Sequence, residues 1–371
     1  MIYLDYNATT PIDPQVADAM RPFLDGNFGN PSSGHAMGRT ARTAVEAARA
    51  SVADLLGASA DEIVFTSGGT EASNMAIKGV AQARSHIGKH FVTTGVEHPA
   101  TLNPMRALGE SGFSRTEVGV DATGLVDPEE IRRAIRHDTI LISVMQAQNE
   151  VGTIEPIEAI GRIAREAGIL FHVDAAQSAG KIPTNADRMR ADLISLAGHK
   201  MYGPKGIGAL YVRGGVELSP LIHGASQERG LRAGTENVMM AVGLGKAAAL
   251  AAEHLADDGV AKMRAYFWKA LSGEFGQRVV LNGHPTLHLP GTLHVSFPGQ
   301  VGGELLGRLD GVCASTGAAC HAGQAEPSSV LKAMKMPRDR AVGAIRFSVG
   351  RPTTRGEIDQ VVAMLRRALD A

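Results

Sequence analysis

Short apolar runs recur along this chain and alternate with segments of helical periodicity, and this alternation is what most constrains the fold. Six runs rich in Val, Ile, Leu and Phe have the character of buried strands: DEIVFTSG, HFVTTGVEH, TILISVMQAQ, GILFHVDAAQ, DLISLAGHK and IGALYVRG. Amphipathic segments lie between them, for example GTEASNMAIKGVAQAR and IEAIGRIAREAG. Strands that alternate with helices form mostly parallel sheets with crossover helices on both faces. We therefore predict an α/β fold.

The pattern changes after an Ala-rich stretch over residues 238–255, which we expect to form one long helix. Beyond it come LPGTLHVSFPG, a loop rich in Gly and Ala, and AIRFSVG, which alternates strictly between apolar and polar residues. This pattern predicts a second, smaller α+β domain. We expect a large domain over residues 14–250 and a small domain made of residues 1–13 and 251–371.

Charge and composition exclude several classes of partner. The formal net charge is −1 and no long basic run occurs, so we expect neither nucleic acid nor a membrane surface as partner. The first residues, MIYLDYNATTP, lack the pattern of a signal peptide, and no apolar run reaches the length of a membrane span. Two cysteines are too few for a disulfide framework or a zinc site, which favours a cytoplasmic enzyme with reduced thiols.

Polar residues that follow the predicted strands are the candidates for a ligand site, because α/β sheets bind ligands beyond the carboxyl ends of their strands. In FTSGGTEASN a strand leads into a helix start at Gly69 and Thr70, which is typical of a phosphate-binding turn. A glycine turn capped by Thr70 is the alternative. In HVDAAQ the strand ends at Asp174, with Gln177 three residues later. A buried carboxylate needs a partner, and a protonated pyridine nitrogen fits as well as a core hydrogen bond.

Lys200, preceded by His199, follows the next strand, and His98 follows HFVTTGVE. A lysine in such a place can form a Schiff base with an aldehyde cofactor, although a solvated lysine is the more common case. The His98 imidazole could stack on a flat ring and move protons, or it could simply belong to the turn before Pro99. A phosphate-binding turn, an acid for a ring nitrogen and a lysine at one sheet edge together fit pyridoxal 5'-phosphate.

Two residues of the predicted small domain complete the set. Cys320 lies among small residues in CASTGAACHAGQ, where a thiol would be accessible to a substrate, although a structural thiol is equally consistent. Cys313 follows an apolar run, and we expect it to be buried. In AIRFSVGR we expect Arg346 to face away from Ile345 and Phe347. An arginine there can bind a carboxylate through two hydrogen bonds, or it can lie on a solvated sheet face.

These motifs, in this order, resemble the cysteine desulfurases of the class V aminotransferase group, which have fold type I of the pyridoxal-phosphate enzymes. The likeness extends almost from end to end through YLDYNATTP, GNPSSGH, VFTSGGTEASN, VEHPA, NEVGT, FHVDAAQ, GHKMYGPKGIGALY, QERGLRAGTEN, GAAC and IRFSVGR. The resemblance implies a mostly parallel seven-stranded sheet with helices on both faces. It also implies removal of sulfur from L-cysteine, with L-alanine as product and a persulfide on Cys320 that passes to an acceptor.

The resemblance also implies roles around the cofactor ring. Lys200 would hold the cofactor, Asp174 would pair with its pyridine nitrogen, and Gln177 would contact its ring hydroxyl. His98 would stack on the ring and act as a catalytic residue. Asn149, in QAQNEVG, would lie near both the ring hydroxyl and the substrate.

Phosphate and substrate contacts follow from the same resemblance. Gly69 belongs to the phosphate-binding turn, where Thr70 and His199 would bind the phosphate. Thr235, in RAGTEN, would reach the phosphate in a neighbouring subunit, which implies a homodimer. The substrate carboxylate would be bound by Arg346, with help from Asn7.

Three departures from the family pattern affect these expectations. Ala197 stands where many relatives have a serine that contacts the phosphate, and Gln148 stands where asparagine is usual. The chain ends with its last predicted helix, VVAMLRRALDA, whereas the housekeeping members of the family have a longer tail that binds an iron–sulfur scaffold protein. The form of the Cys320 loop also matches selenocysteine lyases, so release of selenide from L-selenocysteine is an alternative, while His98-Pro99 favours the nitrogen-fixation type desulfurases. Transamination and a purely sulfur-binding role are weaker alternatives.

Overall fold

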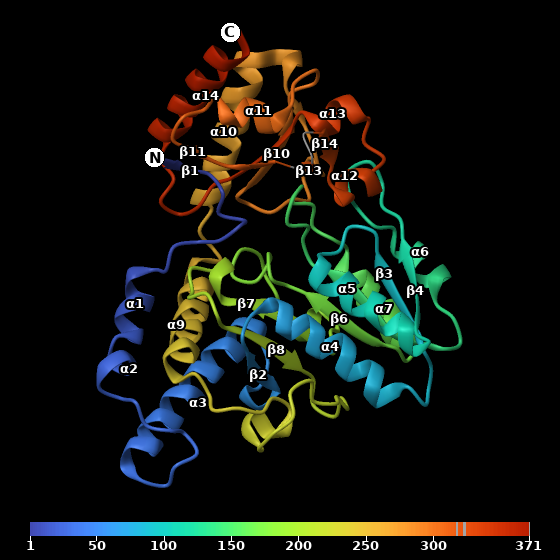
Figure 1. The fold of residues 1–371 in the computed structure, drawn as a ribbon, viewed down its shortest axis with the longest axis vertical. Helices are drawn as coiled ribbons and strands as arrows, with labels where there is room; N and C mark the ends of the chain where they lie inside the picture. Colours follow the sequence, from blue (N-terminus) through green and yellow to red (C-terminus); the bar gives the residue numbers. More distant parts are fainter. Residues whose placement is uncertain (317, 322–323, 371) are drawn as a thin grey trace.

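A computed structural model describes residues 1–316, 318–321 and 324–370 of the chain, without the side chains of residues 318–321 and 324–325. The larger part of the molecule is built on a seven-stranded sheet (Figure 1). In it, β8 runs antiparallel to both neighbours and the other strands pair in parallel. In spatial order the strands are β2 (Ile63–Thr66), β8 (Gly208–Val212), β7 (Leu193–Ala197), β6 (Leu170–Asp174), β5 (Thr139–Met145), β3 (His90–Thr94) and β4 (Ser114–Val118). The predicted α/β fold is thereby confirmed.

Both faces of this sheet are buried under helices. Successive side chains of each strand point to opposite faces, so each strand contributes to two apolar cores. Ile142 of β5 packs in one apolar core and its neighbour Leu141 packs in the other. The second core lies under α4 (Gly69–Arg84) and α5 (Pro99–Leu108). Helices on the first face are α3 (Ala36–Leu56), α6 (Pro128–Ala134), α7 (Ile157–Glu166), α8 (Ala186–Met189) and α9 (Val238–His254). The helix expected over residues 238–255 is thus α9.

A smaller four-stranded antiparallel sheet forms the upper part of Figure 1. Its strands, in spatial order, are β12 (Ser315–Thr316), β15 (Ala344–Ser348), β10 (Thr292–Ser296) and β9 (Val280–Leu281). Ile345 and Phe347 of β15 pack in an apolar core, as the alternation predicts. The helices beside this sheet are α10 (Gly259–Phe275), α11 (Gly302–Gly307), α12 (Ser329–Ala333), α13 (Arg338–Val342) and α14 (Arg355–Asp370).

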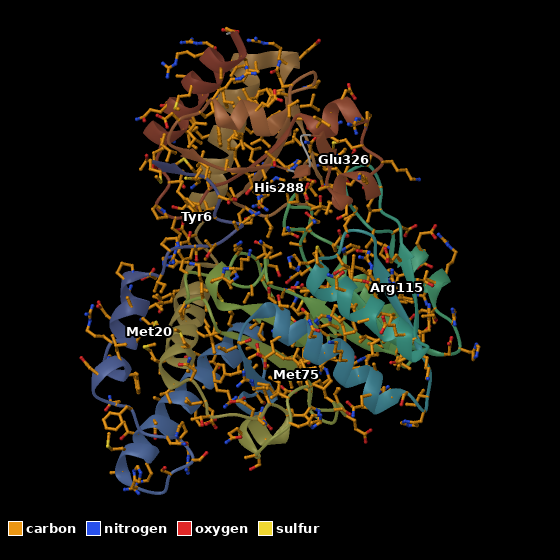
Figure 2. The ribbon with its side chains drawn as sticks, viewed as in Figure 1. Tyr6, Met20, Met75, Arg115, His288 and Glu326 are labelled. Atoms are coloured by element: carbon orange, nitrogen blue, oxygen red, sulfur yellow. The ribbon has the colours of Figure 1, made fainter. Side chains whose placement is uncertain are left out.

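The two ends of the chain lie together in this upper part (Figure 1). The first strand, β1 (Ile2–Tyr3), pairs in parallel with β11 (Val312–Cys313). The chain then passes to the larger part, where α1 (Pro14–Met20) starts after Asp13, whose side chain caps it. Tyr6 and His288 line a cavity between the two parts (Figure 2). The domain limits 14–250 and 251–371 stay a prediction.

Three further features bear on the expectations from the sequence. A hairpin of β13 (Ala318–His321) and β14 (Gln324–Pro327) places the Cys320 backbone opposite Ala325. Cys313 is only half-buried, so the expectation that it is buried was wrong; it lies on the short strand β11, which pairs only with the two-residue strand β1 among the described strands. Within the described part of the chain, no single helix is long and apolar enough to cross a membrane. The helical segments Val238–His254 and Gly259–Arg278 have the length and apolar composition of a membrane span only when they are counted as one, and they are bent by 69° at the break between them.

Candidate active site

A cavity of about 360 Å³ opens beyond the carboxyl ends of β2, β3, β5, β6 and β7. Parallel strands end at the same sheet edge, so the polar residues that follow them converge there. Most of the residues singled out from the sequence line this cavity: Asn7, Gly69, Thr70, His98, Asn149, Asp174, Gln177, His199, Lys200 and Arg346. Side chains far apart in the sequence are thus gathered at one site.

The turn between β2 and α4 is packed tightly enough to require glycine. A Cβ atom on Gly69 would lie 3.2 Å from the Ala197 Cβ. A Cβ on Gly208 of β8 would lie 2.6 Å from the carbonyl carbon of Gly68, which ordinary contacts do not allow. The α4 helix starts at Gly69, and the exposed Thr70 follows in its first turn. Free N–H groups at this helix start, beside a hydroxyl, can bind a phosphate.

Asp174 ends β6 with its carboxylate buried at the floor of the cavity. Its Oδ1 accepts a hydrogen bond from the backbone N–H of Ala176, at 2.9 Å. Burial raises the pKa of Asp174, while this hydrogen bond and the nearby His98 and Lys200 lower it. A carboxylate with so few donors is suited to bind a cationic partner from the cavity.

Lys200 follows β7, and its amine reaches the N-terminal segment of the chain. Nζ donates hydrogen bonds to the backbone carbonyls of Asn7 and Ala8. Burial, and then the Arg346 charge, lower the pKa of Lys200 to about 8, although Asp5 and Asp174 oppose this shift. An amine with such a pKa is neutral often enough near pH 7 to act as a nucleophile.

Two histidines flank this amine. The Nδ1 atom of His98 accepts from the backbone N–H of Ala100 at 3.1 Å, so a neutral His98 ring carries its proton on Nε2. The His199 ring bonds the Thr9 hydroxyl at 3.1 Å. Desolvation in the site lowers the pKa of His98, and desolvation, with the Lys200 charge second, lowers the pKa of His199 to about 4. Both rings are therefore neutral near pH 7.

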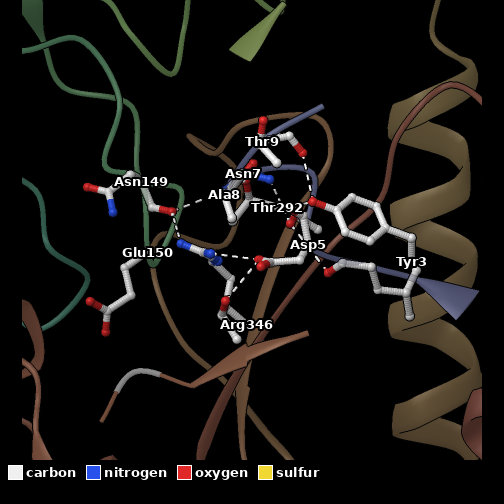
Figure 3. A network of polar contacts seen from close by, with 12 residues as sticks. Tyr3, Asp5, Asn7, Ala8, Thr9, Asn149, Glu150, Thr292 and Arg346 are labelled. Carbon is white, nitrogen blue, oxygen red and sulfur yellow. Dashed lines mark hydrogen bonds and ion pairs between the residues drawn. The ribbon is translucent and has the colours of Figure 1, made fainter. Parts of the chain in front are cut away.

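Arg346 of β15 is buried, which excludes the alternative of a solvated sheet face. Its guanidinium donates to the Asn149 carbonyl at 3.0 Å and to the Asp5 carboxylate at 2.7 Å (Figure 3). The Asn7 side chain donates to the same Asn149 carbonyl and to the Thr292 hydroxyl. These two bonds use one N–H group on each terminal nitrogen, so each terminal nitrogen keeps a second N–H group for a ligand, and the buried Nε has no hydrogen-bond partner among the described residues.

Gln177 is held from two sides in this site. Its Nε2 donates to the Asn7 carbonyl at 2.7 Å, and its Oε1 accepts from Lys181 Nζ at 2.8 Å. The sequence analysis missed both Lys181 and Asp5. Asp5 lies in the same motif as Asn7, and Lys181 lies one helical turn after Gln177, but neither position by itself indicates a contact.

Two expected site residues are not placed in the cavity. Thr235 is exposed and does not line it, so its contact with a neighbouring subunit stays a prediction. The side chain of Cys320 lies outside the described residues. Of the two departures at single residues, Ala197 lines the cavity, whereas the buried Gln148 accepts backbone N–H bonds from Glu150 and Val151.

Comparisons with known proteins agree with this arrangement. The model of the family described as Aminotransferase class-V matches residues 2–361. A cysteine desulfurase IscS from Dictyoglomus turgidum is 48% identical, and the alignment covers 100% of this chain and 94% of the relative. The one from Methanosarcina thermophila is 46% identical, over 98% of this chain and 91% of the relative.

Solved structures give the same result. A NifS-like protein superposes with a TM-score of 0.93 at 39% identity, covering 100% of this chain and 99% of the other. The structure titled "SspA in complex with cysteine" has a TM-score of 0.85 at 39% identity, over 94% of this chain and 99% of the other. By these matches the chain belongs to the class-V aminotransferase family and, within it, to the cysteine desulfurase group.

Proposed function

We propose that this protein is a cysteine desulfurase that uses pyridoxal 5'-phosphate to convert L-cysteine to L-alanine and passes the sulfur to Cys320. The observation that carries this proposal is the convergence of three groups in one cavity: the Lys200 amine, the buried Asp174 carboxylate and the glycine turn before Thr70. Relatives named cysteine desulfurase, and a similar structure titled as a complex with cysteine, support the substrate.

The residues present fit this cofactor. Asp174 lacks a cationic partner among the described side chains and could bind a protonated pyridine nitrogen, while the α4 start has free N–H groups for a phosphate. Lys200 would bind the aldehyde carbon, and Gln177 would contact the ring hydroxyl. When bound, the group supplies the electron sink that allows the substrate to lose its α-proton and its sulfur.

The chain's own residues supply binding and proton transfer. Arg346 orients the substrate through its carboxylate, with Asn7 and Asn149 beside it. Lys200 Nζ, with its lowered pKa, takes the α-proton and returns it. His98 holds a proton on Nε2 and donates it toward the substrate side of the cavity.

Sulfur transfer is assigned to Cys320 on the β13–β14 hairpin. The overall change is balanced: cysteine and the Cys320 thiol give alanine and the Cys320 persulfide, with no external oxidant or reductant. The persulfide sulfur then passes to an acceptor.

A homodimer is part of this proposal. Two large apolar side chains near the start of the larger part are exposed, Leu24 to 71% and Phe28 to 77%, and a second copy of the chain could cover them. Thr235 is exposed too, as a residue must be if it contacts a neighbouring subunit's phosphate. A cytoplasmic location stays a prediction from cysteine usage.

The test is to supply L-cysteine to the cofactor-loaded protein and to quantify alanine and the persulfide on Cys320 by mass spectrometry. We expect one equivalent of each per chain in a first turnover without acceptor. The Cys320→Ser variant should form no persulfide. Alanine release from L-selenocysteine but not from L-cysteine would refute the proposal, as would amino-group transfer to an added keto acid.

A further inference from the structure

Glu150 has a buried carboxylate between the two parts of the molecule, and the mechanism above does not use it. It follows Asn149 in the loop after β5, and its side chain is 12% exposed. Its Oε1 accepts a hydrogen bond from the Ser328 hydroxyl at 2.6 Å and lies 3.8 Å from Nε2 of His294. The carboxylate therefore comes from the larger part but contacts donors of the smaller part.

The protonation of His294 can be derived from its neighbours. Oδ1 of Asn282 accepts from Nε of Arg340 at 2.8 Å, so the Asn282 amide nitrogen must face Nδ1 of His294, at 2.9 Å. Nδ1 is thus an acceptor, and the proton of the neutral ring is on Nε2, which faces Glu150. This Nε2 has no hydrogen-bond partner among the described residues. Burial lowers the pKa of His294 to about 3, so the ring is neutral.

The charge state of Glu150 is sensitive to pH. Burial raises the pKa of Glu150 to about 7, while the Ser328 hydrogen bond and the Arg346 charge lower it. The groups that face the carboxylate are therefore Ser328 at the start of α12, His294 of β10 and Arg346 of β15. Near neutral pH, the loss of a proton from Glu150 therefore adds a negative charge that strengthens its hydrogen bond from Ser328.

Ser328 lies at the foot of the hairpin that carries Cys320. It directly follows β14, whose last residue Pro327 pairs with Ala318 at the start of β13. The Ser328 hydroxyl also caps α12 by accepting from the backbone N–H of Leu331, at 3.2 Å. One contact, from Ser328 to Glu150, thus connects the hairpin foot to the loop that carries Asn149.

We propose that Glu150 is a positioning residue for sulfur transfer, which holds the foot of the β13–β14 hairpin against the Asn149 loop and so controls the approach of Cys320 to the cavity. This inference rests on the proposed function for its chemistry. The hydrogen bond from Ser328 to Glu150 itself does not depend on that function.

Two variants test the contact from its two ends. Glu150→Gln keeps an acceptor but removes the charge, and Ser328→Asp keeps a capping oxygen for α12 but places a second carboxylate against Glu150. The control is Glu326→Gln, which removes a carboxylate of β14 whose partners are the exposed Lys332 and Arg338.

Two measurements are made on each protein. The first is the alkylation rate of Cys320 relative to Cys313 in the resting protein, followed by mass spectrometry with iodoacetamide. The second is the rate of the first alanine turnover with L-cysteine, together with its KM and its pH profile. The bound cofactor's absorption and the melting temperature report whether the fold is kept.

A hydrogen bond to a charged group changes the ratio of protein with the Ser328–Glu150 contact formed to protein with it broken by roughly tenfold or more. We therefore expect Glu150→Gln and Ser328→Asp to raise the relative alkylation rate of Cys320 and to slow the alanine turnover, each by roughly tenfold. KM and the cofactor absorption should change little, and Glu150→Gln should lose a pH inflection near 7 that the wild type shows. Glu326→Gln should match the wild type.

Wild-type behaviour of Glu150→Gln in both measurements would overturn the inference. So would an effect of Glu150→Gln that Ser328→Asp does not reproduce, because the contact would then not be its cause. If the wild type forms no alanine from L-cysteine but the alkylation ratios change as expected, the proposed function fails and the positioning role of Glu150 stands.

Discussion

A buried ion pair holds the segment that leads to Thr235. Arg49 of α3 donates from both terminal nitrogens to the Glu228 carboxylate, at 2.7 and 2.9 Å, and the two side chains are 4% and 3% exposed. The same carboxylate accepts the backbone N–H of Phe65 in β2, at 2.9 Å. Glu228 and Arg229 have positive φ angles, of 46° and 57°. Such conformations persist only where the surroundings hold them, so this ion pair stabilises the shape of the segment.

We predict that Glu228→Ala lowers the free energy of unfolding by about 3–5 kcal/mol, because it removes the buried counter-charge of the Arg49 guanidinium and leaves only Glu46, whose side chain is 55% exposed, to pair with it. The unfolding entropy is about 2.1 cal/mol/K per residue, so a chain of 371 residues has about 0.8 kcal/mol/K. The predicted loss therefore corresponds to a fall in melting temperature of about 4–6 °C when the chain unfolds as one unit.

The assay is thermal unfolding followed by circular dichroism, with Glu166→Ala as the control. Glu166 pairs with Arg132 on the surface, where the side chains are 60% and 46% exposed, and its loss should leave the melting temperature close to that of the wild type, because water and salt screen such a pair. The double variant Arg49→Met, Glu228→Leu should recover part of the loss, because no isolated charge then stays buried. A Glu228→Ala protein that melts within about 1 °C of the wild type would refute this reasoning.

Three further predictions concern the site and the core. The rate at which cofactor-free protein captures pyridoxal phosphate should rise with pH around a midpoint near 8, the lowered pKa of Lys200, and a stopped-flow absorption series checks this. Gly208→Ala should weaken cofactor binding about tenfold or more in a titration, because its Cβ would displace the Gly68 turn, whereas Gly214→Ala, which has space, should not. Burial raises the pKa of Glu155 to about 8, so the folded protein binds more protons than the unfolded chain between about pH 4.5 and 8. Stability should therefore fall as pH rises through that window, and urea titrations of Glu155→Gln should show a smaller fall.

The fold was predictable because its main signal is local. Six strands of the large sheet appear as apolar runs, since both sheet faces are buried and every residue of these strands is buried, most of them apolar. The strand that the runs do not indicate is β4, SRTEV, which lies at the sheet edge with only Val118 buried. An edge strand needs no continuous apolar run, so its pairing with β3 is visible only in three dimensions.

The site residues that follow parallel strands were predictable from the sequence, because the carboxyl ends of such strands meet at one sheet edge. The site residues whose contacts join distant parts of the chain were not. Lys200 and Asp174 were found because both follow parallel strands, whose ends must meet. Asp5 pairs with Arg346, and Glu150 with Ser328, across 341 and 178 positions of the chain. No spacing rule connects such residues, because their proximity depends on how the small sheet packs against the larger one.

The N-terminal segment explains how the two cations of the site are kept apart and available. Asp5 holds Arg346, while the carbonyls of Asn7 and Ala8 hold the Lys200 amine. If Arg346 binds the substrate as proposed, the carboxylate must either use the remaining N–H groups of the terminal nitrogens or take the place of Asp5. Replacement exchanges one carboxylate for another beside Lys200, whose pKa the Asp5 charge raises. Substrate entry by that route would therefore keep a carboxylate on Arg346, the cation whose charge lowers the pKa of Lys200.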